Sequence, residues 1–419
     1  MKSSTARGTV TAPPSKSYSH RAMILGALTH APFVLRSPLI SEDTKATLDA
    51  LHALGSDVHG TPVELKIHCE KLSPPLGVID AGNSGTTIRL IAGIASLLHG
   101  PTTLTGDASL VRRPMAPLTN ALTQLGAKCT FIGKHGAPPM TISGPITGPR
   151  AEISGGISSQ FVSSLLIACS QKQGNTCIVV EGQIASRPYV DITVEMLRRF
   201  GGVVEEKASE FSLPGNQGLE LGSYTVPGDY SSASFPLVAA AITGGDATVR
   251  NLDRDSPQGD KAIVQHLQSF GAEVSINKES IRVKGGRLTG VEIDVRNTPD
   301  LFPVLAVLGA VADGKTVLRG GENLRQKESD RIATTTSFLR DMGARIKPTD
   351  DGCEIVGGEK LHGATVKTDG DHRILMAAVV AALVSSSETR IEDNDSYLVS
   401  YPGFMRDMHQ LGCRLEVRK

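Results

Sequence analysis

The chain has 419 residues, of which 40% are hydrophobic and 21% charged, so it can form substantial cores, and its length indicates two or three domains. Its 43 basic and 43 acidic residues give a formal net charge of zero, and aromatic residues make up only 4%, which argues against an RNA-binding protein. The start of the chain lacks an apolar signal-peptide core, and the longest apolar run, residues 374–384, is shorter than the ~20 residues that span a bilayer. We therefore expect a cytoplasmic protein that binds neither nucleic acid nor membrane, with residues 374–384 in a buried helix.

The cysteines are spread along the chain, with no C-x-x-C pair and no spacing to histidine that is typical of a metal site. They are Cys69, Cys129, Cys169, Cys177, Cys353 and Cys413. Scattered single cysteines of this kind are typical of reduced, mostly buried thiols in a cytosolic protein. We expect reduced thiols and no bound metal.

In chain order, a short strand over residues 7–10 comes first. Six polar segments follow, most of them with Gly or Ser, and each runs into an apolar helical pattern. They begin, at intervals of about 70 residues, at Ser15, Gly82, Ser158, Gly228, Asn297 and Gly370. Each repeat also ends an amphipathic helix with a glycine of the kind that caps helix C-termini, at Gly55, Gly126, Gly201, Gly271, Gly343 and Gly412. The even spacing predicts six copies of one structural unit.

Within each copy the pattern predicts strand, helix, strand, helix, strand, strand, and the fourth copy shows it best. There a strand pattern over 246–252 precedes a helix over 262–272 and two strands around a turn at 278–280. Six copies could form one solenoid or two globes of three, and we favour two globes because each copy carries its own strand–helix core. The predicted fold is α/β (α+β), with an N-terminal globe over 12–227 and a C-terminal globe formed by 1–11 plus 228–419. A cleft between globes would be a natural place for a small-molecule site.

The six helix starts are candidate anion sites, because a helix N-terminus presents unpaired N–H groups and the positive end of the helix dipole. The alternative is that Ser, Asp and Asn at these positions only cap the helices. Lys16 and Arg21 favour a ligand at the first start, since cations at the positive end of a helix are unfavourable without a nearby anion. The start at Gly228 has no such residues, and we interpret it as a hinge with an ordinary cap.

Two further segments carry polar residues suited to a ligand. The glycine-rich turn over 80–89, which contains Asn83 and Gly85, would let a ligand approach the backbone closely. It is followed by the segment 106–114 with Arg113, which could also be an ordinary surface charge.

The segment 323–331 is the richest in charge. If it is helical from Lys327, then Lys327 and Arg331 lie on one face with Glu328 beside them. Charge pairing on a solvated helix is a common alternative explanation. A carboxylate held among cations can also transfer protons, although the cations by themselves favour its ionised form.

Residues 309–316 match the P-loop pattern G-x-x-x-x-G-K-[ST]. A P-loop follows a strand and opens a helix, whereas this segment follows an apolar helical pattern and precedes a strand pattern. We interpret it as the exit from a helix and expect no nucleotide there.

Taken in order, the segments SKSYSHR, GNSGTT, RRP, SSQF, SRPY, NLRQKESDR, DHR and SYPGF resemble the enolpyruvyl transferase family over essentially the whole chain. The resemblance implies two domains, each of three βαβαββ repeats with helices inside and mixed sheets outside, and an active site in the interdomain cleft. It also implies transfer of the carboxyvinyl group of phosphoenolpyruvate to the 5-hydroxyl of shikimate 3-phosphate, with no cofactor and as a monomer. Glyphosate, which mimics phosphoenolpyruvate in this family, is a candidate inhibitor, and the sequence does not establish sensitivity to it.

The resemblance also assigns site residues. Those expected to bind shikimate 3-phosphate are Lys16, Ser17, Arg21, Ser158, Ser159, Gln160, Ser186, Tyr189, Asp300, Asn323 and Lys327. Those expected to bind phosphoenolpyruvate are Lys16, Asn83, Gly85, Thr86, Arg113, Gln160, Glu328, Arg331 and Arg373. For catalysis we expect Asp300 as the base at the 5-hydroxyl and Glu328, with Lys16, for proton transfer at the methylene carbon of phosphoenolpyruvate.

The sequence departs from the family pattern at two positions. Val399 stands where many relatives have a lysine two residues before Tyr-Pro, so one cation toward phosphoenolpyruvate is missing or is supplied elsewhere. Arg187 replaces a lysine with the charge kept. The nearest alternative is the cell-wall branch, which uses UDP-N-acetylglucosamine, but that branch has a Lys-Asn pair where this chain has Lys16-Ser17 and a cysteine in the loop before Arg-Pro. A non-enzymatic repeat scaffold is the alternative of a different class.

Overall fold

The computed structural model describes residues 3–416, and its residues form two compact units. We call residues Pro14–Val226 the N-unit, and residues up to Pro13 together with those from Pro227 onward the C-unit. The strands of the described chain form five four-stranded sheets and one two-stranded sheet. The prediction of an α/β protein is therefore confirmed.

The N-unit alternates helices and short strands. Its helices are α1 (Lys16–Ala27), α2 (Glu42–Ala53), α3 (Gly85–Ala95), α4 (Ala116–Gln124), α5 (Ser159–Gln171) and α6 (Pro188–Arg199), with the 3-10 turn η1 (Leu110–Arg112). Its strands are β2 (Phe33–Arg36), β3 (Asp57–Thr61), β4 (Glu64–His68), β5 (Ile79–Asp80), β6 (Thr102–Thr105), β7 (Lys128–Phe131), β8 (Met140–Ser143), β9 (Arg150–Ser154), β10 (Thr176–Glu181), β11 (Glu205–Lys207), β12 (Glu210–Leu213) and β13 (Ser223–Thr225).

The C-unit follows the same plan. Its helices are α7 (Tyr230–Ile242), α8 (Ile263–Phe270), α9 (Phe302–Val311), α10 (Arg331–Asp341), α11 (His372–Ala382) and α12 (Phe404–Gln410), with 3-10 turns η2 (Gly259–Ala262), η3 (Pro299–Leu301), η4 (Glu322–Gln326) and η5 (Ser396–Val399). Its strands are β1 (Arg7–Thr11), β14 (Asp246–Arg250), β15 (Glu273–Ile276), β16 (Ser280–Lys284), β17 (Glu292–Asp294), β18 (Gly314–Arg319), β19 (Arg345–Pro348), β20 (Cys353–Gly357), β21 (Thr365–Val366) and β22 (Arg390–Ile391).

Every four-stranded sheet has the same mixed order. In the sheet β5-β6-β8-β7, for example, β5 pairs parallel with β6, and β8 pairs antiparallel with both β6 and β7. A parallel pair needs a crossover connection, and the buried helix α3 supplies it. The repeated topology places one buried helix start after the first strand of each sheet.

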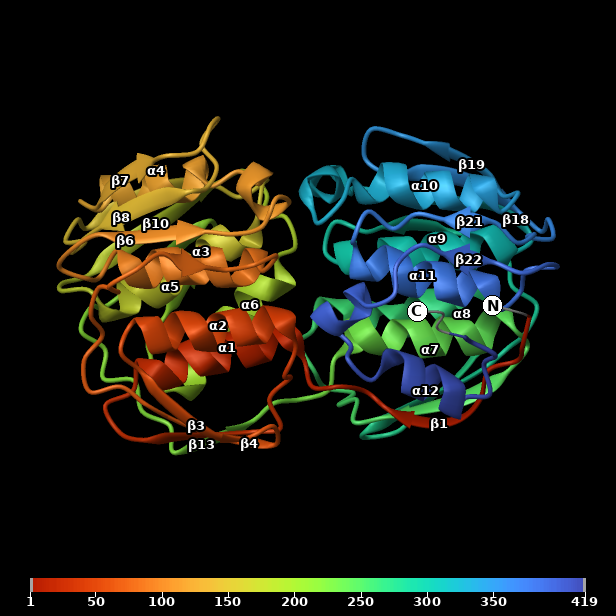
Figure 1. The fold of residues 1–419 in the computed structure, drawn as a ribbon, viewed down its shortest axis with the longest axis horizontal. Helices are drawn as coiled ribbons and strands as arrows, with labels where there is room; N and C mark the ends of the chain where they lie inside the picture. The colour runs from red at the N-terminus through yellow and green to blue at the C-terminus, as the bar shows by residue number, and fades with distance from the viewer. Residues whose placement is uncertain (1–2, 417–419) are drawn as a thin grey trace. The chain divides into compact units, whose positions relative to one another are not determined.

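The first strands of two sheets come from distant parts of the chain. The predicted strand at 7–10 is present as β1, and it pairs parallel with β14, with Val10 opposite Val249. The first repeat instead takes β13, in which Tyr224 lies opposite Leu35 of β2. In Figure 1, β1 is accordingly the red strand among the green and blue elements of the C-unit.

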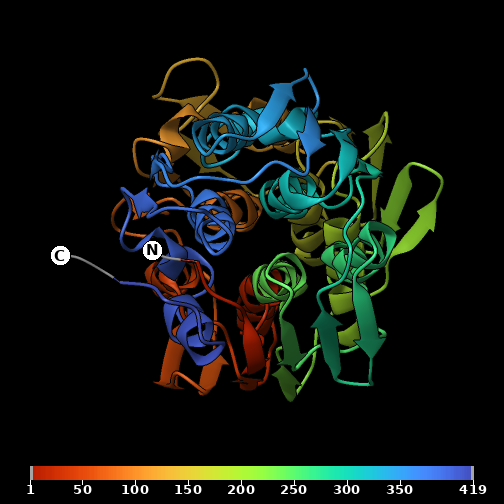
Figure 2. The same cartoon turned by 90° about the vertical axis from the view of Figure 1, so that its right-hand side faces the viewer.

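Helices fill the interior of each unit. All residues of α7 are buried, as is nearly every residue of α9 and α11, and Figure 2 shows these three helices end on with strands of the C-unit outside them. Small residues permit the close packing: a Cβ on Gly93 of α3 would lie only 2.6 Å from Ser164 Oγ of α5. The strands expose alternate residues, as β9 does with its exposed–buried pattern, so each sheet has one face in solvent. The apolar run at 374–384 falls largely in buried helix α11, as predicted.

The predicted helix-ending glycines are confirmed by their backbone. Gly55, Gly126, Gly201, Gly271, Gly343 and Gly412 all have φ between +81° and +104°. This left-handed region costs a residue with a Cβ more than it costs glycine, which explains the recurrence of glycine there.

The sixth repeat departs from the predicted strand–helix order. Its sheet contains only β21 and β22, and α12 is followed by no further strand in the described residues.

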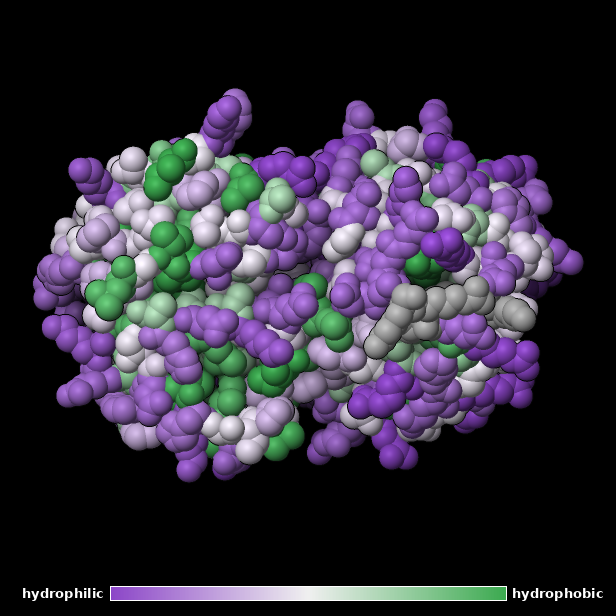
Figure 3. All heavy atoms as spheres, viewed as in Figure 1, coloured by the Kyte–Doolittle hydropathy of each residue, from purple (hydrophilic) through white to green (hydrophobic). Residues whose placement is uncertain are grey.

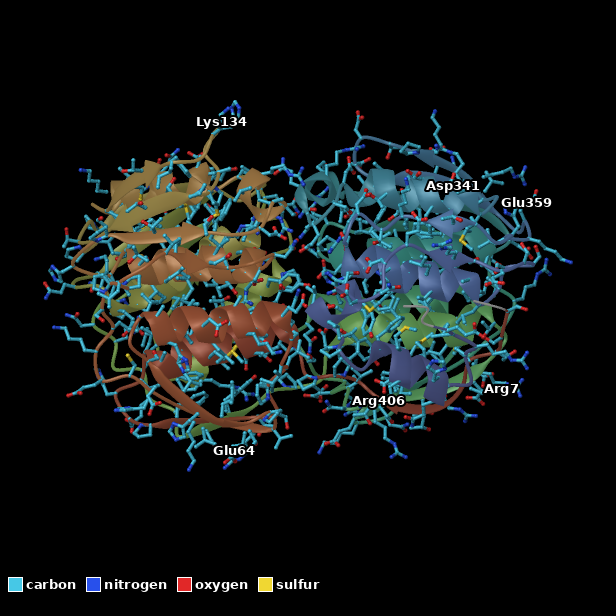
Figure 4. All side chains as sticks on the ribbon, in the orientation of Figure 1. Arg7, Glu64, Lys134, Asp341, Glu359 and Arg406 are labelled. Carbon is cyan, nitrogen blue, oxygen red and sulfur yellow. The ribbon has the colours of Figure 1, made fainter. Side chains whose placement is uncertain are left out.

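The surface of both units is mainly polar on the face that Figure 3 shows. On the face seen in Figure 3, hydrophilic residues predominate and apolar residues form small separate groups. Charged side chains such as Lys134 of the N-unit and Asp341 and Glu359 of the C-unit are exposed at the outside of their units (Figure 4). Within residues 3–416, no helix is long and apolar enough to cross a membrane. All six cysteines are free thiols, four of them buried, as the sequence predicts.

Candidate active site

The six predicted helix starts coincide with the starts of the interior helices. Ser15, Ser84 and Ser158 occupy the N-cap positions of α1, α3 and α5 in the N-unit. Asp229 and Asp371 cap α7 and α11 in the C-unit, and η3 leads directly into α9. The caps of the N-unit are therefore neutral, whereas two of the C-unit caps are carboxylates.

Lys16 and Arg21 lie in the first two turns of α1. The Lys16 ammonium pairs with Asp43 of α2 at 2.7 Å, and the Lys16 side chain is 15% exposed. Asp43 was not singled out in the sequence, because nothing local indicates that the first turn of α2 packs beside α1. The ion pair fixes the otherwise mobile Lys16 side chain near the helix start.

Arg21 is buried, and in the described part of the chain its acceptors are neutral oxygens. Nε donates to Thr193 Oγ1 at 2.7 Å, and the two Nη atoms donate to the carbonyls of Ser17 and Tyr189 and to Ser163 Oγ. Burial lowers the pKa of Arg21 to about 10, which still leaves it charged at neutral pH. A buried cation held by neutral acceptors attracts an anion more strongly than one already paired with a carboxylate.

The glycine-rich turn brings two arginines to the start of α3. A Cβ on Gly85 would lie 2.9 Å from an Nη atom of both Arg113 and Arg89, so only glycine leaves room for these guanidiniums against the backbone. Arg113 also donates to Asn83 Oδ1 at 3.0 Å. Arg89, one turn after Gly85 in α3, was not among the predicted site residues.

Gln160 joins this group from the start of α5. Its amide oxygen accepts from Arg89 and its amide nitrogen donates to Thr86 Oγ1 at 2.7 Å. The structure thus brings together most of the N-unit residues expected to bind phosphoenolpyruvate, namely Asn83, Gly85, Thr86, Arg113 and Gln160.

The serines expected to bind a phosphate lie at the starts of α5 and α6. Ser158 accepts from the backbone N–H of Gln160, and Ser159 and Ser186 are buried. Ser186 has φ +56°, a left-handed conformation that is rare for a residue other than glycine and is frequent at functional sites. The carbonyl of Tyr189, in the first turn of α6, accepts from Arg21 and so ties α6 to α1.

In the C-unit, three carboxylates surround the buried guanidinium of Arg331. Its nitrogens lie 2.7 Å from Asp300, 2.7 Å from Glu328 and 2.8 Å from Asp371. Arg373 donates to the second carboxylate oxygen of Asp300 at 3.0 Å. Asp300 therefore bridges the two arginines.

These ion pairs shift the pKa values of Asp300 and Arg331. Burial alone would raise the pKa of Asp300, but Arg373, Arg331 and Lys327 together hold it well below its usual range. Burial alone would lower the pKa of Arg331, but Asp371, Glu328 and Asp300 raise it well above its usual value. Asp300 is thus ionised, and it is a weak base while the arginines hold it.

The helical interpretation of 327–331 is wrong. The turn η4 ends at Gln326, Lys327 is extended with φ −88° and ψ −156°, and α10 begins only at Arg331. Asp330 stops the helix from starting earlier, because its side chain accepts from the N–H of Ala333 as an N-cap. Lys327 and Arg331 are therefore not one helical turn apart, and Glu328 meets Arg331 through the bend between η4 and α10. Asn323 lies within η4.

Asp371 was not recognised in the sequence as a partner of Arg331. It is completely buried and uses both oxygens, accepting from Arg331 Nε and Nη2 while also capping α11. Its place before His372-Arg373 indicated only a helix cap.

The start at Gly228 differs from the others because the unit's own side chains fill it. Asp229 accepts from the N–H and hydroxyl of Ser232, and Gln258 accepts from the N–H of Tyr230. The hydroxyl of Ser231 donates to Asp260. Burial, followed by the charge of Asp300, raises the pKa of Asp260 to about 7, although Arg373 opposes the shift. The carboxyl groups of Asp229 and Asp260 therefore already occupy the N-terminus of α7, where the other starts were predicted to bind a substrate anion.

The structure also shows the surroundings of Val399 and Arg187, the two positions that depart from the family pattern. Val399 ends η5 and is mostly buried. Arg187 pairs with Asp191 and Glu206 and lies over the ring of Phe211, so its charge is used within the N-unit.

Comparisons with known proteins agree over almost the full chain. Residues 1–408 match the family model described as EPSP synthase (3-phosphoshikimate 1-carboxyvinyltransferase). A 3-phosphoshikimate 1-carboxyvinyltransferase from Methanocella arvoryzae is 47% identical over 414 residues, covering 98% of this chain and 97% of that protein. One from Methanothrix thermoacetophila is 47% identical over 416 residues, covering 98% of this chain and 97% of that protein. A solved structure of EPSP synthase from Acinetobacter baumannii superimposes with a TM-score of 0.83 at 32% identity, covering 100% of this chain and 98% of that one. This chain therefore belongs to the EPSP synthase (3-phosphoshikimate 1-carboxyvinyltransferase) family.

Proposed function

We propose that this chain transfers the carboxyvinyl group of phosphoenolpyruvate to the 5-hydroxyl of shikimate 3-phosphate and releases phosphate, a step in aromatic amino acid biosynthesis. The observation that carries the proposal is a set of buried arginines near helix starts. They are Arg21 of α1 and Arg113, whose guanidinium lies against the start of α3, in the N-unit, and Arg331 of α10 and Arg373 of α11 in the C-unit. Both substrates carry a carboxylate and a phosphate, and guanidinium groups bind these groups through paired hydrogen bonds.

The N-unit is the proposed site for shikimate 3-phosphate. Ser17 and Arg21 would bind its carboxylate, and the serines at the starts of α5 and α6, Ser158, Ser159 and Ser186, would bind its phosphate. Gln160 and Tyr189 would line the ring. The neutral surroundings of Arg21 support this role, because they leave its charge for an incoming anion.

Phosphoenolpyruvate would use groups from both units. The proposed contacts are Lys16, Asn83, Gly85, Thr86, Arg113 and Gln160 of the N-unit, with Glu328, Arg331 and Arg373 of the C-unit. Asn323, Lys327 and Asp300 would reach shikimate 3-phosphate from the C-unit. The proposal therefore requires two domains of three repeats that enclose one pair of substrates between them. We propose that the two domains close when the first substrate binds, and a radius of gyration that stays the same in X-ray scattering when saturating shikimate 3-phosphate is added would contradict this closure.

The reaction needs two proton transfers in its first half. A base removes the proton of the 5-hydroxyl as its oxygen bonds to C2 of phosphoenolpyruvate, and an acid protonates the methylene carbon C3, which gives a tetrahedral ketal. In the second half a proton leaves the new methyl group, the C2–O bond to phosphate breaks and phosphate departs. We assign Asp300 as the base and Glu328, with Lys16, as the group that moves the proton at C3.

The ion pairs of the C-unit suggest how Asp300 becomes a base. If the anionic groups of phosphoenolpyruvate take the guanidiniums of Arg331 and Arg373, the cations no longer hold the Asp300 carboxylate at 2.7 Å and 3.0 Å. The pKa of Asp300 then rises toward the range in which it accepts a proton. The same displacement would free Glu328 from Arg331.

The test is phosphate release from phosphoenolpyruvate when either shikimate 3-phosphate or UDP-N-acetylglucosamine is added. We expect turnover with shikimate 3-phosphate only, because Ser17 follows Lys16 and the segment 106–114 has no cysteine. Turnover with the nucleotide sugar alone would replace the proposal by the cell-wall reaction, and no turnover with either acceptor would favour a scaffold. We further propose that the enzyme is a monomer, which analytical sedimentation can check. We also propose that glyphosate competes with phosphoenolpyruvate, which the phosphate-release assay can check.

A further inference from the structure

A line of buried hydrogen bonds joins α1, α2 and α3 in the N-unit. His20 Nδ1 lies 2.7 Å from Thr47 Oγ1, which lies 2.7 Å from Thr87 Oγ1. Thr87 Oγ1 in turn lies 2.7 Å from Ser84 Oγ. All four side chains are at most 1% exposed. The line ends beside Gly85 at the start of α3, and the proposed mechanism uses none of its members.

The imidazole of His20 is neutral, and its hydrogen can be assigned to one nitrogen. Burial, together with the charges of Lys16 and Arg21, lowers the pKa of His20 well below its usual value. Nε2 is buried and has no hydrogen-bond partner among the described residues. A buried N–H without an acceptor is rarer and costlier than a bare lone pair, so the hydrogen belongs on Nδ1, where it is donated to Thr47.

This assignment gives every hydrogen bond in the line a direction. Among the described residues, Thr47 Oγ1 has two hydrogen-bond partners, His20 Nδ1 and Thr87 Oγ1. Because it accepts from His20, its one hydrogen is donated to Thr87. Thr87 then donates to Ser84 Oγ at 2.7 Å rather than to the carbonyl of Asp43 at 3.3 Å. Ser84 Oγ also accepts from the backbone N–H of Thr87 at 3.2 Å.

The hydroxyl of Ser84 therefore accepts twice, and its own hydrogen must point away from both donors. Ser84 immediately precedes Gly85, where a Cβ would lie 2.9 Å from a guanidinium nitrogen of both Arg113 and Arg89. A hydroxyl donor directed by two incoming hydrogen bonds complements these cations in binding an anion.

We propose that the Ser84 hydroxyl donates to the anion bound at the start of α3, and that His20, acting through Thr47 and Thr87, is a positioning residue that fixes the direction of this donor. The identity of the anion as phosphoenolpyruvate rests on the proposed function. His20 itself touches no substrate.

The first test breaks the middle of the line. Thr47→Val keeps the shape of the side chain and removes its hydroxyl, and Ser84→Ala removes the final donor. We expect each variant to raise KM for phosphoenolpyruvate about tenfold while KM for shikimate 3-phosphate stays within about twofold. The double variant should be no worse than Ser84→Ala, because Thr47 acts only through Ser84. Effects that multiply in the double variant would overturn the proposal.

The matched control is Thr102→Val. Thr102 is a completely buried threonine of the same unit whose hydroxyl has no hydrogen-bond partner among residues 3–416. It controls for the loss of a buried hydroxyl as such, and we expect KM for phosphoenolpyruvate to stay unchanged. A rise equal to that of Thr47→Val would show general loosening of the core and would overturn the proposal.

The second test changes the origin of the line. The side-chain amide of asparagine can place an N–H near the position of Nδ1, whereas leucine cannot, so His20→Asn should keep KM for phosphoenolpyruvate near normal and His20→Leu should match Thr47→Val. Equal values for the two variants would overturn the role of His20. Calorimetric titration with phosphoenolpyruvate alone reports the same interaction without turnover. An unmodified chain that releases no phosphate would contradict the proposed function, whereas equal calorimetric affinities of the unmodified chain and Thr47→Val would contradict only the positioning role.

Discussion

Arg21 in the N-unit and Arg331 in the C-unit are equally buried, but their partners differ. Arg21 is held by hydroxyl and carbonyl oxygens, whereas Arg331 is surrounded by the carboxylates of Asp300, Glu328 and Asp371. Within residues 3–416, the N-unit thus offers a positive charge that is paired with no carboxylate, whereas the C-unit offers one that is already paired with three. The difference suggests that an anion enters the N-unit site directly but must displace Asp300 in the C-unit.

The largest expected effect comes from removing a proton-transfer group. Glu328→Gln in the C-unit and Lys16→Met in the N-unit should each lower kcat at least ~100-fold, the lower end for loss of general acid–base catalysis. If only one of them does so, the proton transfer at C3 belongs to that unit alone. Circular dichroism should report an unchanged fold, and near-normal kcat in both variants would remove these roles.

A smaller effect is expected from changing the shape of the N-unit cation while its charge is kept. Arg21→Lys removes the planar fork that contacts Thr193, Ser17, Ser163 and Tyr189. We expect KM for shikimate 3-phosphate to rise between about 10- and 100-fold, the range for loss of a hydrogen bond to a charged group. The control is Arg36→Lys, because the Arg36 side chain is 50% exposed and pairs with Glu64. Equal KM values for the two variants would contradict an anion site at Arg21.

The smallest effect on turnover is expected at the filled start of α7, where Asp260 changes stability and not catalysis. The folded-state pKa of Asp260, about 7, lies above the ordinary aspartate value, so the folded state binds the proton more tightly than the unfolded state does. Asp260 therefore lowers stability as pH rises from about 4 to about 7, and this loss is complete above pH 7. Asp260→Asn has no such titration. The melting temperature of this variant minus that of the unmodified chain should therefore rise between pH 5 and pH 8, by about 2–4 °C for each kcal/mol of unfolding free energy that the unmodified chain loses. A difference that does not change with pH would show that Asp260 titrates normally.

Local signals in the sequence predicted the repeated elements well. The apolar periodicity and the glycines at positive φ mark the interior helices and their ends, since both depend on neighbouring residues alone. The start of α10 was predicted four residues early, because the pairing of Lys327 with Arg331 looked helical and the capping by Asp330 was not weighed.

The parts that the sequence did not predict depend on contacts between distant segments. The pairing of β1 with β14 and of β13 with β2 joins residues about 200 or more positions apart, and no local pattern encodes it. The same holds for the ion pairs of Asp43 with Lys16 and of Asp371 with Arg331. The resemblance to a family supplied the candidate site residues, but the internal pairing of the C-unit arginines emerges only from the structure.

The central claim is that the C-unit arginines are paired with carboxylates that substrate must displace, whereas Arg21 of the N-unit is not. The most direct test is the affinity of Asp300→Asn for phosphoenolpyruvate, measured by calorimetry without an acceptor so that no turnover occurs. If Asp300 competes for Arg331 and Arg373, the variant should bind phosphoenolpyruvate about tenfold more tightly than the unmodified chain, even though it loses turnover. Asp341→Asn is the control, because it changes the net charge equally at an exposed position of α10. Affinity that is unchanged or weaker in Asp300→Asn, or equally tighter in Asp341→Asn, would contradict the displacement of Asp300 by substrate.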